Sequence, residues 1–147
     1  MKAVIQRVKF ARVVIDQTIY SEISSGLLVF IGVTHNDDLN DINFMANKIC
    51  NLKVFEDEKG HLGKSLLEVN LELLLVSNFT LFADTQKNRL SFLNAAKPDV
   101  ALTIFNDTVK QIEQQLNKQI KVGDFGKYMN VQFDNDGPVT ITLDSKL

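Results

Sequence analysis

The sequence predicts a mixed α/β domain in which two main helices cover a sheet or a partly closed barrel. Several short segments have the alternating or continuously apolar pattern of β-strands. Two longer segments repeat apolar residues every three or four positions, as amphipathic helices do. No repeat, low-complexity stretch or linker divides the 147 residues, so we expect a single domain over residues 1–147.

The first half of the chain is expected to begin with strands and to continue into a helix. Residues 2–20 alternate and are rich in β-branched side chains, which predicts a strand pair or one long bent strand. Leu27–Val33 is apolar apart from Gly32 and is expected to be a central strand. Asp37 and Asp38 are suitable N-caps for the helix that follows. Its buried face is predicted to contain Leu39, Ile42, Met45, Ala46, Ile49 and Cys50.

The second half is expected to hold the most apolar strand, a second helix and the last strands. Residues 71–79 read LELLLVSNF and predict a central strand, followed by a polar loop over residues 83–91. Pro98 suits the first turn of the second helix, where a missing N–H costs nothing. The buried face of this helix is predicted to contain Ala101, Ile104, Phe105, Thr108, Ile112 and Leu116. The other predicted elements are strands at 54–55, 120–122, 128–133 and 139–143, a turn at 57–60, and a turn over 134–137 that separates the last two strands.

Composition excludes several classes of protein. A net charge of −2 argues against a globally basic nucleic-acid binder, though not against a local basic patch. One cysteine and two histidines cannot form a zinc site of the usual Cys/His kind, and His35 and His61 have no partner pattern for a catalytic triad. No apolar run approaches the roughly 20 residues of a membrane helix, and no signal peptide is recognisable. We therefore expect a cytoplasmic protein without membrane contact.

The first candidate site lies at the end of the most apolar strand, at Ser77-Asn78-Phe79-Thr80. Ligands of α/β proteins often bind where strands end. Ser77 and Thr80 could donate hydrogen bonds to an oxyanion, or Thr80 could be a nucleophile if a base lay within reach. Alternatively, these hydroxyls only satisfy backbone groups at a strand end.

The second and third candidates are a Gly-Pro segment and the basic start of the chain. Asn135-Asp136-Gly137-Pro138 has the composition of a hairpin turn, but a proline beside a strand also permits a cis bond and a functional role.

At the basic start of the chain, Lys2, Arg7, Lys9 and Arg12 precede the first acidic residue, and Arg7 and Lys9 would share a face of a regular strand. They could contact phosphates, or they could form an ordinary solvated face.

Motifs along almost the whole chain resemble those of the D-aminoacyl-tRNA deacylases. They begin with MKAVIQRV and continue through KICNLKVFEDEKG, VSNFTLFAD, AAKPDVA and GDFGKYMNV to NDGPVTITLDS. A Ser-Gln-x-x-Thr motif of that family maps onto Ser77 and Thr80. The most specific match is the family's Asn-x-Gly-Pro-x-Thr motif, which maps onto Asn135, Gly137, Pro138 and Thr140.

The resemblance implies an editing hydrolase that cleaves the ester between a D-amino acid and the 3′-terminal adenosine of tRNA. It also implies a homodimer, in which Gly137 and Pro138 of one subunit, joined by a cis bond, enter the pocket of the other and exclude L-aminoacyl groups. Achiral glycine would then be accepted too, including glycine misattached to alanine tRNA. The 2′-hydroxyl of the adenosine is expected to assist the reaction, and no cofactor or metal is implied.

The resemblance also assigns roles to individual side chains. Thr80 and Ser77 are expected at the catalytic centre, where they position the ester and stabilise the oxyanion rather than attack the substrate. Arg7, together with Asn135 and Thr140, is expected to support the Gly-Pro segment. The substrate pocket is expected to be lined by Asn78, Phe79, Phe125 and Met129.

Three features depart from the family pattern. Asn78 stands where the family usually has glutamine, and Lys127 replaces a small residue and could add a phosphate contact. The loop over residues 86–92 lacks a usual glycine and has Leu90 in place of proline. Two other functions stay open at this level: a non-catalytic module that binds RNA ends through the basic first strand, and a structural dimer formed by apolar strands.

Overall fold

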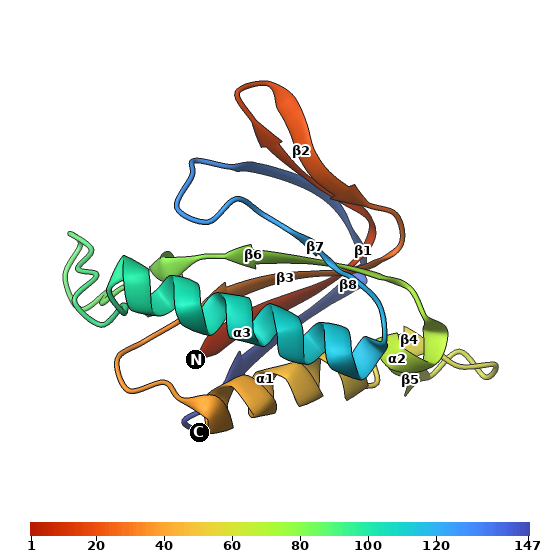
Figure 1. Cartoon of the computed structure of the whole chain (residues 1–147). Helices are drawn as coiled ribbons and strands as arrows, with labels where there is room; N and C mark the ends of the chain where they lie inside the picture. Colours follow the sequence, from red (N-terminus) through yellow and green to blue (C-terminus); the bar gives the residue numbers. More distant parts are fainter.

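The computed structural model describes residues 1–147 and consists of one large sheet, a small two-stranded sheet and helices packed beside the large sheet (Figure 1). The strands are β1 (Lys2–Ile15), β2 (Thr18–Ile23), β3 (Gly26–Gly32), β4 (Phe55–Glu56), β5 (Leu62–Lys64), β6 (Glu72–Ser77), β7 (Lys121–Val122) and β8 (Asn130–Asp144). The helices are α1 (Leu39–Asn51), α2 (Leu66–Val69) and α3 (Pro98–Leu116), with a short 3₁₀ helix η1 (Phe79–Phe82). None of the helices combines the length and the apolar character that crossing a membrane requires.

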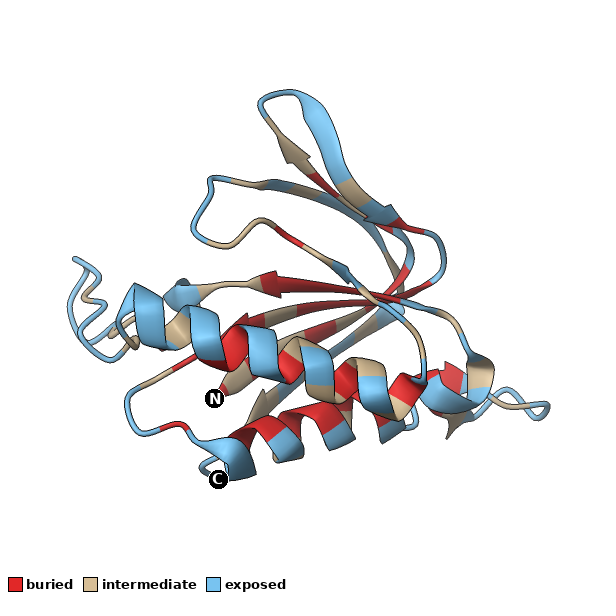
Figure 2. Cartoon of the chain, viewed as in Figure 1, coloured by how far each residue is buried: buried red, intermediate tan, exposed pale blue.

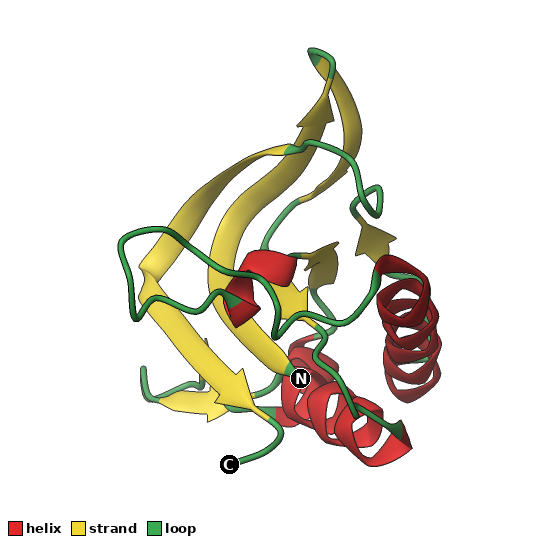
Figure 3. Ribbon diagram, turned by 90° about the vertical axis from the view of Figure 1, so that its left-hand side faces the viewer, coloured by secondary structure: helices red, strands yellow, loops and turns green.

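Strand β1 organises the large sheet. It pairs antiparallel with β8 on one edge, and on the other edge with β3 along its first part and β2 along its last part. β6 joins β3 in parallel and β7 joins β6 in parallel. The Ser21 hydroxyl donates a hydrogen bond to the carbonyl oxygen of Val122 at 2.8 Å, which links β2 to β7. The sheet therefore curls into a nearly closed barrel (Figure 3), as the sequence predicted.

The two central strands are apolar on both faces because each face meets a different core. Leu27 and Val29 of β3 belong to a cluster of 21 buried residues that α1 and α3 cover (Figure 2). Leu28, between them, belongs to a second cluster of seven buried residues inside the curl of the sheet. Leu74 of β6 lies in the same inner cluster, whereas Leu75 faces the helices. Burial on both faces explains why these strands read as continuous apolar runs rather than as alternating ones.

Both predicted helices are present. α1 begins after Asp38, whose side chain accepts from the backbone N–H of Asn40, while the Asp41 carboxylate accepts from the backbone N–H of Asp38. α3 begins at Pro98, as predicted, and buries Ile104, Phe105, Thr108, Ile112 and Leu116. Ala101 is half-buried. The exposed Leu39 is the one predicted member of the α1 face that does not reach the core.

The predicted turn over residues 134–137 is wrong, because β8 is one continuous strand from Asn130 to Asp144. Between Gln6 and Val8 of β1, the paired residue on β8 changes from Thr140 to Asn135. The residues left over on β8 form a bulge that contains Gly137 and Pro138. Proline has no N–H to give to the ladder, so a bulge is the place where a strand can hold it.

Smaller differences concern boundaries near the site. The strand predicted over residues 71–79 ends at Ser77, and the chain then turns into η1. The strand predicted from residue 128 begins at Asn130, which leaves Tyr128 and Met129 in the preceding loop. β5 and α2 were not predicted, since three or four residues carry too little periodicity to identify.

Candidate active site

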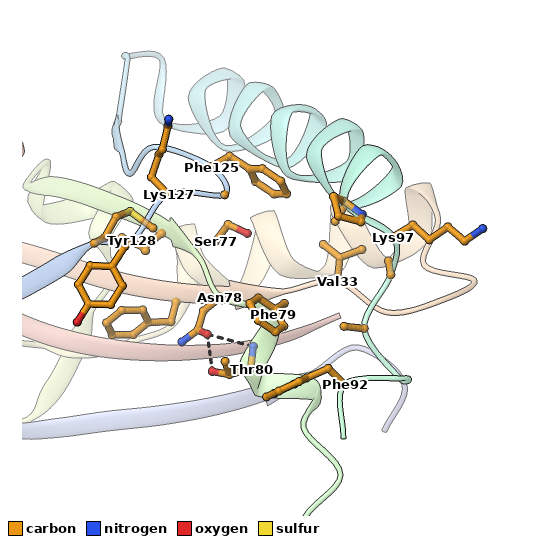
Figure 4. A pocket seen from close by; sticks show the side chains of 18 of the residues that line it. Val33, Ser77, Asn78, Phe79, Thr80, Phe92, Lys97, Phe125, Lys127 and Tyr128 are labelled. Carbon is orange, nitrogen blue, oxygen red and sulfur yellow. Dashed lines mark hydrogen bonds between the residues drawn. The ribbon is translucent and has the colours of Figure 1, made fainter. Parts of the chain in front are cut away.

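A cavity of about 880 Å³ opens beside the end of β6 (Figure 4). Its walls come from β6 and η1, the start of α3 with the segment before it, and the loop between β7 and β8. Of its 19 lining residues, 12 are hydrophobic, so the cavity suits a ligand with large apolar surfaces. Its polar side chains are Ser77, Asn78, Thr80, Lys97, Lys127 and Tyr128.

The end of β6 positions the polar groups. The backbone N–H of Asn78 donates to the carbonyl oxygen of Ile31 at 2.8 Å, which continues the pairing of β6 with β3. The chain then turns, because the Asn78 side chain caps η1. Its Oδ1 accepts from the Thr80 backbone N–H at 3.1 Å and from the Thr80 hydroxyl at 2.5 Å. The Thr80 hydroxyl is thus exposed and oriented by an amide, not by a base.

Aromatic rings form much of the rest of the wall. Phe79 and Phe92 meet edge to face with ring centroids 5.0 Å apart, and Phe79 is 56% exposed at the opening. Phe125, from the loop before β8, packs against Phe105 of α3 with centroids 6.0 Å apart. This edge-to-face contact joins η1 to the loop that follows it and so stabilises that side of the cavity wall.

No aspartate, glutamate, histidine or cysteine lines the cavity. The charged groups at its edge are the lysines Lys97 and Lys127, both exposed. Cys50 lies in the core between α1 and the sheet, where burial raises the pKa of its thiol to about 11. A buried, protonated thiol is neither a nucleophile nor a base at neutral pH. The chain therefore places no carboxylate, imidazole or thiolate at this cavity to act as a general base.

The Gly-Pro segment lies elsewhere on the same chain. Gly137 and Pro138 are exposed on the β8 bulge, their peptide bond is cis, and neither lines the cavity of their own chain. Asn135 Nδ2 donates to the carbonyl oxygens of Arg7 at 3.0 Å and Val139 at 3.3 Å, which spans the bulge. The Thr140 hydroxyl donates to the side chain of Gln6 at 2.5 Å, just beyond it.

Arg7 supports this bulge from beneath. Its Nε donates to the carbonyl oxygen of Asp136 at 3.2 Å and lies 3.4 Å from the Asp136 carboxylate. Its Nη1 donates to the carbonyl oxygen of Val54 at 2.9 Å. Arg7 is buried while Lys9 is exposed, because the pairing of β1 with β8 shifts register on both sides of Val8. The expectation that Arg7 and Lys9 share a face open to phosphates is therefore wrong for Arg7.

The structure brings one group of predicted residues together and leaves another apart. The predicted site residues that line the cavity are Ser77, Asn78, Phe79, Thr80, Phe125 and Met129. The residues predicted for selectivity and support gather around the bulge instead, namely Arg7, Asn135, Gly137, Pro138 and Thr140. The two groups do not meet within one chain.

Sequence reasoning missed part of the cavity wall. Phe30, Val33 and Val76 were assigned to the core alone, and Pro98 only to the start of a helix, although all four line the cavity. Phe92 also lines it, and an aromatic residue directly after the predicted polar loop was the available signal. Nothing in the local pattern marked Ala95, Ala96 or Val131.

Comparisons with known proteins identify the family of this chain. A family model described as D-Tyr-tRNA(Tyr) deacylase matches residues 4–144. The D-aminoacyl-tRNA deacylase of Cytophaga hutchinsonii is 50% identical over 147 residues, which cover 99% of this chain and 98% of that protein.

Two solved structures have the same fold. A structure titled "c-Myc DNA Unwinding Element Binding Protein" is 40% identical, with a TM-score of 0.94 and coverage of 98% of both chains. A second, titled as a probable eukaryotic D-amino acid tRNA deacylase, has a TM-score of 0.85 over 97% of both chains at 13% identity, which supports the fold alone. The family model and the full-length relative decide the matter: this chain belongs to the D-Tyr-tRNA(Tyr) deacylase family.

Proposed function

We propose that this chain hydrolyses the ester that joins a D-amino acid to the 3′-terminal adenosine of tRNA. The observation that carries the proposal is the cavity at the end of β6 in a chain of this family. It is large and mostly apolar, with hydroxyl and amide groups at one end and no carboxylate, imidazole or thiolate. We further infer that the protein acts in the cytoplasm, because charged tRNA is used there.

The cavity suits the end of a charged tRNA in both size and chemistry. Its aromatic walls fit an adenine ring and an amino-acid side chain. The Ser77 hydroxyl and the Asn78 Nδ2 are the proposed hydrogen-bond donors to the ester carbonyl, whereas the Thr80 N–H and hydroxyl both donate to the Asn78 Oδ1 and hold that amide in place. These residues act by positioning the ester and by stabilising the oxyanion of the tetrahedral intermediate.

The absence of a carboxylate, imidazole or thiolate favours assistance from the substrate itself. In the proposed reaction, water attacks the ester carbonyl carbon, and the bond from this carbon to the ribose 3′ oxygen breaks. The neighbouring 2′-hydroxyl of the adenosine relays one proton of the water to the ribose 3′ oxygen, which leaves as a hydroxyl, and the other proton is released to solvent as the amino acid leaves as a carboxylate. Thr80 is not the nucleophile in this scheme, because its hydroxyl proton is held by the Asn78 amide oxygen, which is too weak a base to remove it.

Selectivity is proposed to come from a second copy of the chain. In a homodimer, the Gly137–Pro138 segment of one subunit enters the cavity of the other and occupies the space of an L-side chain. Two observations support this arrangement: the segment is exposed and does not line its own cavity, and Arg7 and Asn135 brace it. Exclusion of this kind admits glycine, so glycyl-tRNA for alanine is a proposed second substrate.

The deciding experiment compares enantiomers. Purified protein is mixed with D-tyrosyl-tRNA or L-tyrosyl-tRNA without added metal, and the remaining ester is measured over time. We expect the D-ester to be hydrolysed and the L-ester to survive. Equal hydrolysis of both would contradict the proposed selectivity, and tight binding without cleavage would instead indicate a module that binds RNA ends.

Two further measurements separate the finer parts of the proposal. A tRNA that ends in 2′-deoxyadenosine should be cleaved much more slowly, whereas an unchanged rate would refute assistance by the 2′-hydroxyl. Sedimentation should show a dimer, and an enforced monomer should lose the discrimination between enantiomers. A fully selective monomer would contradict the contribution of a second subunit.

A further inference from the structure

The loop between β7 and β8 carries two adjacent side chains that the fold does not use. Tyr128 is 94% exposed, far more than any other aromatic residue of the chain, and its hydroxyl makes no hydrogen bond. Lys127 is exposed too, and its ammonium has no ion-pair partner. Only the backbone of Lys127 is engaged, through its N–H to the carbonyl oxygen of Asp124 at 3.2 Å. Both side chains are therefore free to bind another molecule.

Their position is not an arbitrary one on the surface. Both residues line the cavity at the end of β6 (Figure 4), on the opposite side from Phe92 and Lys97. In that view the two side chains leave the loop in different directions, the Tyr128 ring on the side of Asn78 and the ammonium of Lys127 away from it. No acidic residue lines the cavity, so the charge of Lys127 is not cancelled there.

We propose that Lys127 and Tyr128 form a binding subsite for the single-stranded nucleotides that precede the terminal adenosine. The tyrosine ring stacks on the base of one of these nucleotides, and the lysine contacts a phosphate of the same strand. This inference rests on the proposed function, because it places the aminoacyl-adenosine in the cavity and the preceding residues of the strand at its edge.

The chemistry of single-stranded RNA favours this assignment. Exposed aromatic rings bind unstacked bases whatever their sequence, and a neighbouring cation follows the phosphate backbone. The diverging directions of the two side chains suit a strand whose bases and phosphates point to different sides. The overall charge of −2 means that such contacts must be local, and this loop is a local site beside the cavity. The competing occupant, a second copy of the chain that covers Tyr128, is an outcome of the test below.

The experiment compares two non-hydrolysable probes. One is 3′-deoxy-3′-(D-tyrosylamino)adenosine, which fills the cavity alone, and the other is the same group at the end of a CCA trinucleotide. Dissociation constants are measured by calorimetry for the unchanged protein and for Tyr128→Ala and Lys127→Ala. Two exposed residues outside the cavity provide matched controls, Tyr20→Ala on β2 and Lys121→Ala on β7.

We expect the unchanged protein to bind the trinucleotide more tightly than the nucleoside. Tyr128→Ala should weaken trinucleotide binding about tenfold more than it weakens nucleoside binding, and Tyr128→Phe should restore trinucleotide binding because stacking needs only the ring. Lys127→Ala should lower the slope of log Kd against log salt by about 0.7 for the trinucleotide, which is the effect of one lost phosphate contact to a single strand. Neither control substitution should change the dissociation constant of either probe.

Each other result overturns the inference in a recognisable way. If the trinucleotide still binds more tightly than the nucleoside by the same factor in both variants as in the unchanged protein, the loop does not bind the strand. If Tyr128→Ala changes the sedimentation of the protein and leaves trinucleotide binding intact, the ring contacts a second copy instead. If the unchanged protein binds neither probe and cleaves no D-aminoacyl-tRNA, the proposed function fails, and the subsite fails with it.

Discussion

The support of the Gly-Pro bulge by Arg7 leads to a prediction for both stability and selectivity. Arg7→Met keeps an apolar stem of similar length and removes the hydrogen bonds to the carbonyl oxygens of Asp136 and Val54. A hydrogen bond from a charged donor contributes about 1.5–3 kcal/mol, and loss of the buried charge recovers part of its desolvation cost. We therefore expect a loss of about 3 kcal/mol, which lowers Tm by roughly 6–12 °C for a domain of this size.

We expect Arg7→Met to make the Gly-Pro bulge less rigid, because the bulge loses its hydrogen bond to Arg7. If the bulge of one subunit excludes L-aminoacyl groups from the other, Arg7→Met should reduce the ratio of D- to L-tyrosyl-tRNA hydrolysis at least tenfold. The ratio is measured well below Tm, on protein whose circular dichroism matches that of the unchanged chain. Arg7→Lys should be intermediate, because lysine keeps the charge without the planar fork of donors.

A matched control lies on the same strand. Lys9 is exposed, so Lys9→Met should change neither Tm nor the ratio. An Arg7→Met variant with an unchanged Tm and an unchanged ratio would refute the reasoning, since the two Arg7 hydrogen bonds would then neither stabilise the fold nor hold the bulge.

Three further predictions concern the cavity, the bulge and a buried carboxylate. Thr80→Ala should keep kcat/KM for D-tyrosyl-tRNA within about tenfold, whereas a loss of more than about 10⁴-fold in a folded variant would identify the hydroxyl as the nucleophile. Gly137→Val should reduce turnover of D-tyrosyl-tRNA at least tenfold. Gly137 has a φ of +128°, and a Cβ there would lie 3.0 Å from the Val139 Cγ2 and 3.2 Å from the Arg7 Nη2, so the bulge would have to change its shape. Normal turnover would show that the bulge does not approach the substrate. Burial by itself would raise the pKa of Asp41, but hydrogen bonds from Lys146, Ser145 and the Asp38 backbone outweigh it and hold the pKa at about 2, below the ordinary 3.8. Because the folded-state pKa is the lower one, the carboxylate contributes about 2 kcal/mol above about pH 4, and this contribution is lost as the pH falls towards about 2. Urea titrations between these pH values should show this loss, and Asp41→Asn should remove that part of the pH dependence; an identical pH dependence in the variant would contradict the assignment.

The sequence correctly predicted the helices and strands whose formation depends on residues close together in the chain. The cap at Asp38, the proline Pro98 in a first turn and the apolar spacing behind each depend on residues within a few positions of each other, so both helices were identified with nearly correct starts. The central strands were recognised for the same reason, since continuous apolar runs such as residues 73–76 belong to strands buried on both faces. Polar residues directly after the last of these strands marked one end of the cavity.

What sequence patterns mispredicted were features that depend on distant partners. Residues 134–137 have the composition of a turn, yet pairing with β1 along both sides of the bulge keeps β8 in one strand. Arg7 looks like an exposed residue of an alternating strand, but its guanidinium is buried because Asp136, 129 positions away, supplies its acceptor. Neither outcome has a local cause.

The sequence by itself determined the class of fold, its principal helices and strands, and the two motifs by which the chain resembles its family. Only the tertiary structure decided that these motifs lie apart within one chain: the first at a cavity completed by α3 and the loop before β8, and the second on an exposed bulge. The physical reason is that periodicity and capping act over one or two turns of chain. The cavity and the bulge, in contrast, arise where segments far apart in the sequence pair and pack.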